Sequence, residues 1–156
     1  PTGLGTLLTE EILFKILENR NDVIEVVGMF QKEVAERICS KPNSKKYGIL
    51  SVLIQAYFSC EYLIDVGSEN FKPVPKVQSS VIKLTRNNTI ELDCAYPDFL
   101  QVVKACFSQR RKKIKNALKN FINLNNTNLP DTLSKRAEQL DVADFIKLTI
   151  NLLQKK

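Results

Sequence analysis

The stretch Val23-Ile24-Glu25-Val26-Val27-Gly28-Met29-Phe30 decides the fold, because its β-branched residues predict a strand directly after a helical segment. Upstream of it, Thr9 is a typical N-cap, and two acidic residues and the apolar run 12–17 follow. This pattern predicts a helix that ends near Asn19. A helix followed by a strand of this kind indicates an α/β layer.

The same alternation continues to about residue 85. Helical spacing predicts helices over residues 31–39 and 47–58, separated by a polar loop at 41–46. Apolar runs predict strands over residues 62–66 and 80–84, with a loop at 67–76 that contains two prolines. The first 85 residues are therefore expected to form one α/β unit.

The strand signal disappears after a polar stretch at residues 86–96, which we interpret as a linker. Phe99, Val102, Val103, Cys106 and Phe107 then recur at helical spacing, and further helices are predicted near Asp131 and after Asp141. The predicted organisation is an α/β unit at 1–85, a linker at 86–96 and an all-helical unit at 97–156.

Composition limits the possible chemistry. The chain has 156 residues, 44% of them hydrophobic, which suits one folded domain or slightly more. It has no histidine, which excludes Ser-His-Asp and Cys-His catalysis by this chain. Its four cysteines form no Cys-x-x-Cys pair, so we expect free thiols and no metal. No leader precedes the first helix and the apolar run 49–58 is too short for a bilayer, so we expect a cytoplasmic protein.

The positive charge of the chain is concentrated in one segment. The net charge is +6, and residues 97–120 alone carry seven basic and one acidic side chain. If residues 108–119 form a helix, Arg111, Lys112, Lys115 and Lys119 share one face, opposite Ile114, Ala117 and Leu118. A stripe of cations favours a polyanion partner. A solvated basic face and a membrane surface are the alternatives.

The loop Asn70-Phe71-Lys72-Pro73-Val74-Pro75-Lys76-Val77 is stiffened by its prolines. A stiff loop can hold the Phe71 ring as a platform on which an unpaired base stacks. The alternative is that Phe71 is an ordinary core residue beneath the loop.

Four blocks of the sequence together resemble the ribosomal RNA adenine dimethyltransferase family, most closely its bacterial small-subunit type. They are Met29-Phe30-Gln31-Lys32-Glu33-Val34-Ala35-Glu36-Arg37-Ile38, Tyr47-Gly48-Ile49-Leu50-Ser51-Val52, Phe71-Lys72-Pro73-Val74-Pro75-Lys76-Val77-Gln78-Ser79-Ser80-Val81 and Phe107-Ser108-Gln109-Arg110-Arg111-Lys112. The resemblance implies the C-terminal part of a class I, Rossmann-like methyltransferase sheet followed by a small helical domain. It also implies that Phe71 helps hold the flipped adenine and that Gln109, Arg110, Arg111 and Lys112 face RNA. We add Lys115 and Lys119 to this RNA-binding set.

The resemblance begins near Ile12 and lacks the family's earlier motifs. The family's Asn/Asp-x-Pro-Tyr/Phe motif, which grips the target amine, is absent. Gly3-Leu4-Gly5-Thr6 is similar to the family's first glycine loop, so Gly3 and Gly5 are the candidate cofactor-binding residues, although no strand precedes them. A deletion that joins this loop to the later half, a truncated fragment with an unrelated leader, and an incomplete sequence are open explanations.

The function expected from the resemblance is S-adenosylmethionine-dependent dimethylation of adenosines in small-subunit ribosomal RNA by a longer parent protein. This chain would supply RNA binding and base stacking and would be inactive alone. The partner would be the small ribosomal subunit or its RNA, without a membrane or a metal. A non-enzymatic RNA-binding module and an assembly factor for the small subunit are the alternatives. The missing strands would also leave a parallel sheet with a bare edge and face, which favours self-association.

Overall fold

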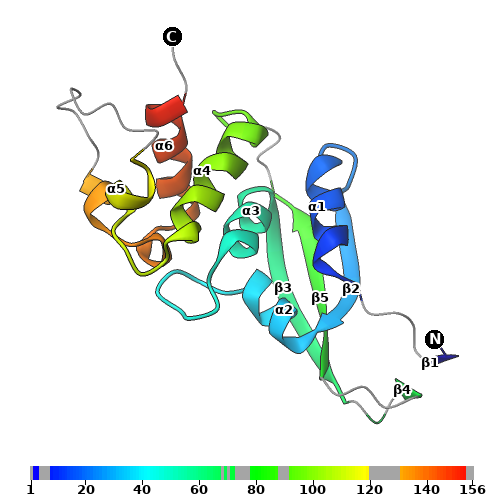
Figure 1. Cartoon of the computed structure of the whole chain (residues 1–156). Coiled ribbons are helices and arrows are strands. Elements are labelled where there is room, and N and C mark those ends of the chain that lie inside the picture. Colours follow the sequence, from blue (N-terminus) through cyan, green and yellow to red (C-terminus); the bar gives the residue numbers. More distant parts are fainter. Residues whose placement is uncertain are drawn as a thin grey trace.

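A three-stranded sheet forms the centre of the first part of the molecule (Figure 1). The computed structural model describes residues 2–3, 8–67, 69, 71–72, 78–87, 92–119 and 131–153. The strands are β2 (Glu25–Gln31), β3 (Phe58–Val66) and β5 (Ser79–Arg86), in the spatial order β2-β5-β3.

The described strands form a mixed arrangement rather than the parallel sheet that we expected. The strand β5 pairs antiparallel with both neighbours, from Glu25↔Thr85 to Gln31↔Ser79 on one side and from Phe58↔Arg86 to Val66↔Ser79 on the other. Because β5 lies between them, β2 and β3 run parallel to each other without pairing. A strand inserted in this way satisfies its backbone groups on both edges.

Helices α1 (Glu10–Glu18), α2 (Lys32–Ile38) and α3 (Ile49–Tyr57) cover one face of the sheet (Figure 1). The apolar spacing explains this, since Leu13, Ile16 and Leu17 of α1 are buried against the sheet side that holds Phe30 and Ile82. These predicted helices are confirmed within two residues at each end, and the polar loop at 41–46 lies between α2 and α3.

The opposite face of the sheet carries apolar side chains that no described helix covers. Met29, Val81 and Ile64 are aligned across the three strands by the registers, and Val27 lies on the same face. Val27 and Ile64 are 57% and 58% exposed. Within the described part of the chain, the expected bare face is therefore present.

The strand β3 is longer than the predicted 62–66. Helix α3 ends at Tyr57, and Phe58 already has extended backbone angles, φ −131° and ψ 149°. Pairing with Arg86 draws Phe58 into the sheet, and the register shifts between Tyr62 and Ile64. Periodicity failed here because the apolar run continues across the helix–strand boundary.

From residue 92 on, the described part of the chain is helical. It contains α4 (Tyr96–Ser108), α5 (Ile114–Ala117) and α6 (Val142–Leu153), with short 3₁₀ turns η2 (Asp131–Ser134) and η3 (Ala137–Gln139). The predicted apolar stripe is buried at Phe99, Val102, Val103 and Cys106, where α4 packs against α6. The first turn of α4 is tied to the α/β part by the Arg20 guanidinium, which lies 5.0 Å from the Tyr57 ring centre and 4.7 Å from that of Tyr96.

Two short strands lie apart from the main sheet. The strand β1 (Thr2–Gly3) pairs antiparallel with β4 (Phe71–Lys72), which places the backbone of Gly3 opposite that of Phe71. Leu8 then forms a single parallel bridge with Phe30 on the outer edge of β2, where the Leu8 N–H donates to the Met29 carbonyl at 2.8 Å.

Candidate functional site

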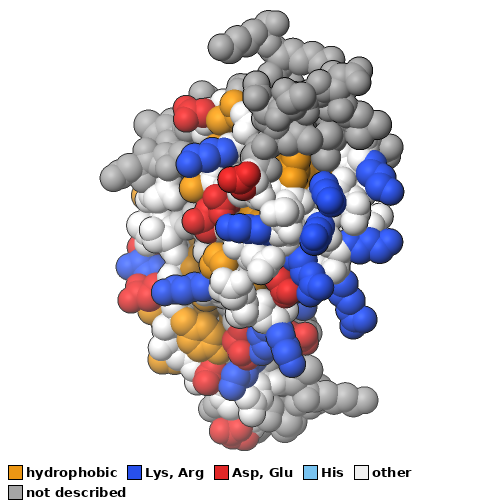
Figure 2. Space-filling view, turned by 90° about the vertical axis from the view of Figure 1, so that its left-hand side faces the viewer, with side chains coloured by type: hydrophobic (Ala, Val, Ile, Leu, Met, Phe, Trp, Pro, Cys, Tyr) orange, Lys and Arg blue, Asp and Glu red, His pale blue; other side chains and the backbone are white. Residues whose placement is uncertain are grey.

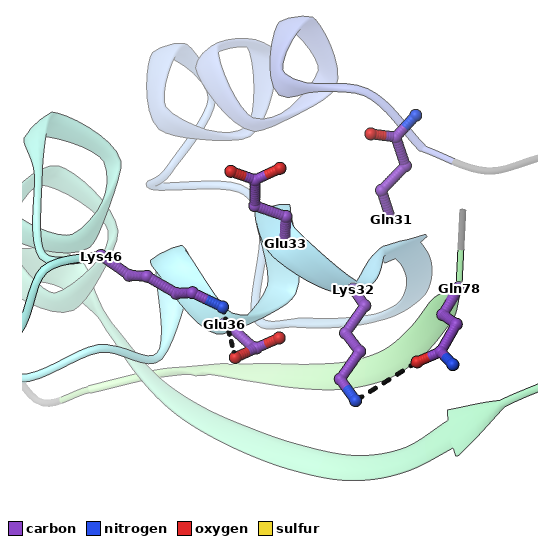
Figure 3. Close-up of a pocket in the computed structure, with 6 residues that line it drawn as sticks. All are labelled: Gln31, Lys32, Glu33, Glu36, Lys46 and Gln78. Atoms are coloured by element: carbon purple, nitrogen blue, oxygen red, sulfur yellow. Dashed lines mark hydrogen bonds and ion pairs between the residues drawn. The ribbon is translucent and has the colours of Figure 1, made fainter. Parts of the chain in front are cut away.

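The carboxyl ends of the parallel strands β2 and β3 lie at one edge of the sheet, which is where ligands bind in open α/β folds. A cavity of about 350 Å³ opens beside the end of β2 (Figure 3). Its lining consists of Gln31, Lys32, Glu33, Glu36, Lys46 and Gln78. All six side chains are polar or charged, so the cavity suits a polar ligand rather than an apolar one.

The charges around this cavity are paired. The Lys46 ammonium lies 2.6 Å from a Glu36 carboxylate oxygen, and Lys32 Nζ donates to Gln78 Oε1 at 3.3 Å (Figure 3). Glu33 lies 3.5 Å from the Arg37 guanidinium, as expected from their i, i+4 spacing. These pairs hold α2, the 41–46 loop and the start of β5 in fixed relation.

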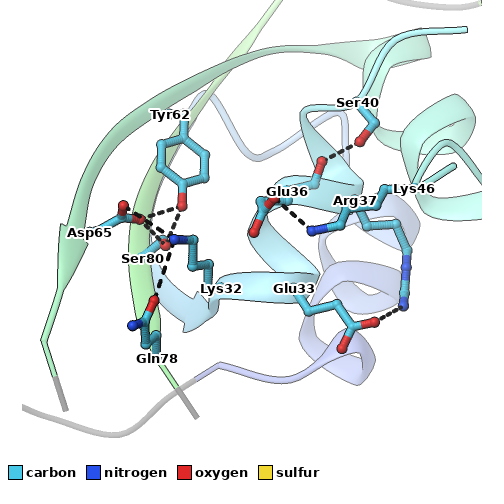
Figure 4. Close-up of polar contacts among 10 residues, drawn as sticks. All are labelled: Lys32, Glu33, Glu36, Arg37, Ser40, Lys46, Tyr62, Asp65, Gln78 and Ser80. Carbon is cyan, nitrogen blue, oxygen red and sulfur yellow. Dashed lines mark hydrogen bonds and ion pairs between the residues drawn. The ribbon is translucent and has the colours of Figure 1, made fainter. Parts of the chain in front are cut away.

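A second polar cluster, made of Tyr62, Asp65, Ser80 and Lys32, joins the end of β3 to the start of β5 (Figure 4). Asp65 Oδ1 accepts from the Tyr62 hydroxyl and from Ser80 Oγ, the latter at 2.8 Å, and Lys32 Nζ lies 3.6 Å from Oδ2. The hydrogen bonds from Tyr62 and Ser80, and then the charge of Lys32, lower the pKa of Asp65. This cluster fixes the positions at which the segment 67–78, which carries Phe71, leaves β3 and enters β5.

The candidate residues of that segment are described only in part. The backbone of Phe71 lies in β4, opposite Gly3. Gly5 lies outside the described residues, as do the two prolines that follow Phe71. The stacking role of Phe71 and the cofactor role of Gly3 and Gly5 stay predictions.

The predicted single basic helix over 108–119 is wrong. Helix α4 ends at Ser108, a turn follows, and the four-residue helix α5 begins only at Ile114. The break has a tertiary cause, because Lys113 adopts an extended backbone and bridges to Arg136, and the Ile114 N–H donates to the Lys135 carbonyl at 2.8 Å. Ile114 and Leu118 are nevertheless buried, so the predicted division into an apolar and a basic side holds.

The basic side forms an exposed surface, which we call the lysine surface and define as Arg111, Lys112, Lys113, Lys115 and Lys119. A hollow of about 710 Å³ here is lined by Gln109, Lys112, Lys113, Lys115, Asn116 and Lys119, with no acidic side chain among them. Among the described residues, no ion pair involves the five cations. Figure 2 shows Lys and Arg side chains gathered along one side of this end of the molecule.

Sequence reasoning missed Lys113 and Asn116 as members of this site. Lys113 does not fall within the helical stripe, and only the turn at 109–113 brings it beside Lys112 and Lys115. Its position inside the run of basic residues was the available signal.

Arg110 differs from its basic neighbours because its guanidinium is engaged within the chain. Nη2 donates to the carbonyls of Lys45 at 2.7 Å and Tyr47 at 2.6 Å, with that of Ser44 at 3.5 Å. Nε lies 3.9 Å from a Glu138 carboxylate oxygen. Arg110 therefore holds the 41–46 loop against the helical part of the molecule, and its contact with RNA stays a prediction.

The three glycines after the N-terminal segment, Gly28, Gly48 and Gly67, are not candidates for binding a methyl-donor cofactor. A pocket for such a cofactor needs a glycine turn between a strand and a helix. Gly28 lies within β2 beside Leu8, Gly48 precedes α3 after a loop, and Gly67 faces Glu69. None of these three occupies such a turn.

Two other kinds of site receive no support from the described ranges. They contain no cluster of three or more side chains that could hold a metal ion. None of their helices is long and apolar enough to cross a membrane.

The chain resembles curated proteins named ribosomal RNA small subunit methyltransferase A. The one from Cytophaga hutchinsonii is 51% identical over 150 residues, covering 96% of this chain and 57% of the relative. The one from Bacteroides thetaiotaomicron is 50% identical over 143 residues, covering 91% and 54%. The chain thus spans little more than half the length of these relatives.

Solved structures show the same fold. A crystal structure of a dimethyladenosine transferase from Plasmodium falciparum matches with a TM-score of 0.76 and 25% identity, over 92% of this chain and 62% of that one. The 23S rRNA methyltransferase ErmE matches with a TM-score of 0.60 and 21% identity, over 93% and 61%, which is a likeness of fold alone. The predicted class I methyltransferase sheet with a helical part after it is confirmed. Since the family description of ribosomal RNA adenine dimethylase matches residues 4–154, this chain belongs to that family.

Proposed function

We propose that this chain is the RNA-binding and base-holding part of a longer enzyme that dimethylates adenosines in small-subunit ribosomal RNA with S-adenosylmethionine. In this proposal, residues 1–85 are part of the methyltransferase domain, 86–96 the linker and 97–156 the RNA-binding domain. The enzyme would act in the cytoplasm on the small ribosomal subunit or its RNA. These 156 residues would be inactive alone.

The observation that carries this proposal is the lysine surface. Its five cations are exposed and form no ion pair among the described residues, and four of them line one hollow. The chain belongs to a ribosomal RNA dimethylase family. Cations that are not neutralised within the protein attract a polyanion, and contacts to phosphates position RNA without reading its sequence.

The second part of the proposal concerns the target base. An enzyme that modifies the exocyclic amine of an adenine must extrude that base, and stacking on an aromatic ring offsets part of the unstacking cost. Phe71 would supply this ring. The Tyr62–Asp65–Ser80 cluster supports the proposal because it anchors both ends of the segment that carries Phe71.

In this proposal, S-adenosylmethionine is bound by a part of the parent enzyme that lies outside these 156 residues. Calorimetric titration of S-adenosylmethionine into the folded chain should therefore give no heat of binding. Micromolar binding would overturn this part of the proposal, whereas RNA binding is tested separately.

RNA binding is tested with a fluorescently labelled ribosomal RNA hairpin at several salt concentrations. Each phosphate contact to single-stranded RNA contributes about −0.7 to the log–log slope of affinity against salt. The Lys115→Ala variant should weaken binding and make this slope shallower by about 0.7. Lys15→Ala, which removes an exposed lysine from α1, is the matched control and should leave the slope unchanged.

Two outcomes separate the candidate functions. An affinity that does not depend on salt would refute the phosphate contacts. If Phe71→Ala leaves binding of the hairpin unchanged while Lys115→Ala weakens it, the chain is an RNA-binding module without a base-holding role.

A further inference from the structure

Lys32 connects the two ends of the segment that carries Phe71. It is the first residue of α2 and follows directly after β2. Its Nζ donates to Gln78 Oε1 at 3.3 Å, where the segment enters β5, and lies 3.6 Å from Asp65 Oδ2, where the segment leaves β3 (Figure 4). Its backbone N–H also donates to the Gln78 carbonyl at 2.8 Å. One side chain from a third element therefore spans both ends of the segment 67–78.

Gln78 lies just outside the sheet. The ladder between β5 and its neighbours ends at Ser79, which pairs with Gln31 on one side and with Val66 on the other. Gln78 lies one residue beyond this last pair and is exposed. The two hydrogen bonds from Lys32 therefore hold Gln78 at the point where the ladder has ended.

Asp65, the other partner of Lys32, is held by the sheet. Its Oδ1 accepts hydrogen bonds from the Tyr62 hydroxyl at 2.5 Å and from Ser80 Oγ at 2.8 Å. These bonds fix the carboxylate relative to β3 and β5, and its Oδ2 is the oxygen next to Lys32. Through Lys32, the carboxylate therefore places the start of α2, and with it Gln78, relative to the end of β3.

The contacts of Lys32 contribute little to the stability of the fold. The Lys32 and Asp65 side chains are 39% and 54% exposed, and Lys32 and Gln78 line the open cavity beside β2. Ion pairs as exposed as this one are weak, because water competes for both charges. Their geometry nevertheless limits where the segment between Asp65 and Gln78 can run. A binding group on a loop depends on such support for its position.

We propose that Lys32 is a positioning residue for the Phe71 ring. Lys32 keeps Asp65 and Gln78 at a fixed separation, so that the segment between them presents Phe71 in one place, and it does not touch the base itself. An aromatic ring stacks on a base only where the two faces are aligned, so a displaced ring loses stacking while the attraction of phosphates is unchanged. Lys32 can have this role only if Phe71 holds the target base, as proposed above.

The test measures base stacking and RNA affinity separately in the full chain. The probe is a single-stranded RNA of uridines with one 2-aminopurine, an adenine analogue whose fluorescence is quenched when it stacks on an aromatic ring. The wild type should bind the probe and quench it, and Phe71→Ala should bind it with little quenching. Lys32→Ala should lose most of the quenching at saturating protein, keep the salt dependence of the wild type, and weaken binding no more than Phe71→Ala does. Lys32→Arg keeps a charged donor and should recover part of the quenching.

Lys83→Ala is the matched control. Lys83 lies 3.1 Å from Glu25 in a similarly exposed ion pair, with side chains 37% and 50% exposed, at the opposite end of the same sheet. The variant removes the same charge and should leave the quenching unchanged. Gln78→Ala removes the other partner of Lys32 and should also lose quenching, so the role can be tested even if Lys32→Ala is unstable.

The outcomes separate this role from the base-holding role of Phe71. If Phe71→Ala quenches as strongly as the wild type, Phe71 does not hold the base, and both roles are overturned. If Phe71→Ala loses the quenching but Lys32→Ala and Gln78→Ala keep it, the base-holding role stands and the positioning role of Lys32 is overturned. A shallower salt dependence for Lys32→Ala with full quenching would make Lys32 a phosphate contact instead. An equal loss of quenching in Lys83→Ala would show that charge alone is responsible, which overturns the positioning role as well.

Discussion

Replacing Arg110 by alanine tests whether this residue is a structural clamp. The side chain donates to the carbonyls of Lys45 and Tyr47 at 2.7 and 2.6 Å and is 37% exposed. A hydrogen bond from a charged donor is worth about 1.5–3 kcal/mol. Partial exposure favours the lower end of that range for each bond, so the two bonds together are worth about 3 kcal/mol. Water can replace the lost donor at Lys45, so we expect Arg110→Ala to lower the free energy of unfolding by about 2–3 kcal/mol.

Equilibrium unfolding in urea measures this change. For a chain of this size, each kcal/mol corresponds to about 2–4 °C, so the melting temperature should fall by roughly 5–10 °C. Arg111→Ala removes an equal charge from the neighbouring exposed position and should change stability by no more than about 0.5 kcal/mol. Arg110→Lys should recover only part of the loss, because one ammonium cannot reproduce the planar donor geometry of guanidinium.

The reasoning is refuted if Arg110→Ala and Arg111→Ala are equally stable. If, in addition, Arg110→Ala alone made the salt dependence of RNA affinity shallower, Arg110 would be a phosphate contact in solution. The loop carbonyls would then have another donor, and the 41–46 loop would not depend on this side chain.

Two further predictions concern the sheet. Tyr62, Ser80 and Lys32 lower the pKa of Asp65 in the folded chain. Its carboxylate therefore stabilises the fold at pH values above the pKa of about 4 that Asp has in the unfolded chain. This stabilisation is lost as the pH falls through the pKa of Asp65 in the folded chain. The stability difference between wild type and Asp65→Asn, measured in urea, should therefore be present at neutral pH and shrink in acid; a difference independent of pH would contradict this. The bare apolar face predicts self-association, which Val27→Lys should reduce in sedimentation velocity because Val27 is 57% exposed beside Met29. The control Thr85→Lys adds the same charge to the same face, but away from the row formed by Met29, Val81 and Ile64. If Thr85→Lys reduced self-association equally, the net charge alone would be responsible.

Much of the fold could be predicted because it follows from local patterns. The helical spacing of Leu13, Ile16 and Leu17 and the β-branched run around Val26 depend on which side of each element is buried, and periodicity reports that directly. The concentration of positive charge before residue 120 is likewise a property of the sequence alone. So is the combination of blocks that resembles the family.

The pairing of elements could not be predicted in the same way. Three features depend on contacts between distant segments. They are the position of β5 between β2 and β3, the end of helix α4 at Ser108, and the hydrogen bonds of Arg110 to backbone carbonyls. A cation in a basic run has the same local pattern whether it faces solvent or a carbonyl. The sequence by itself determined the helices and strands, their buried sides, the distribution of charge and the family. Only tertiary packing decided which polar groups meet, because such contacts depend on long-range geometry rather than on neighbours along the chain.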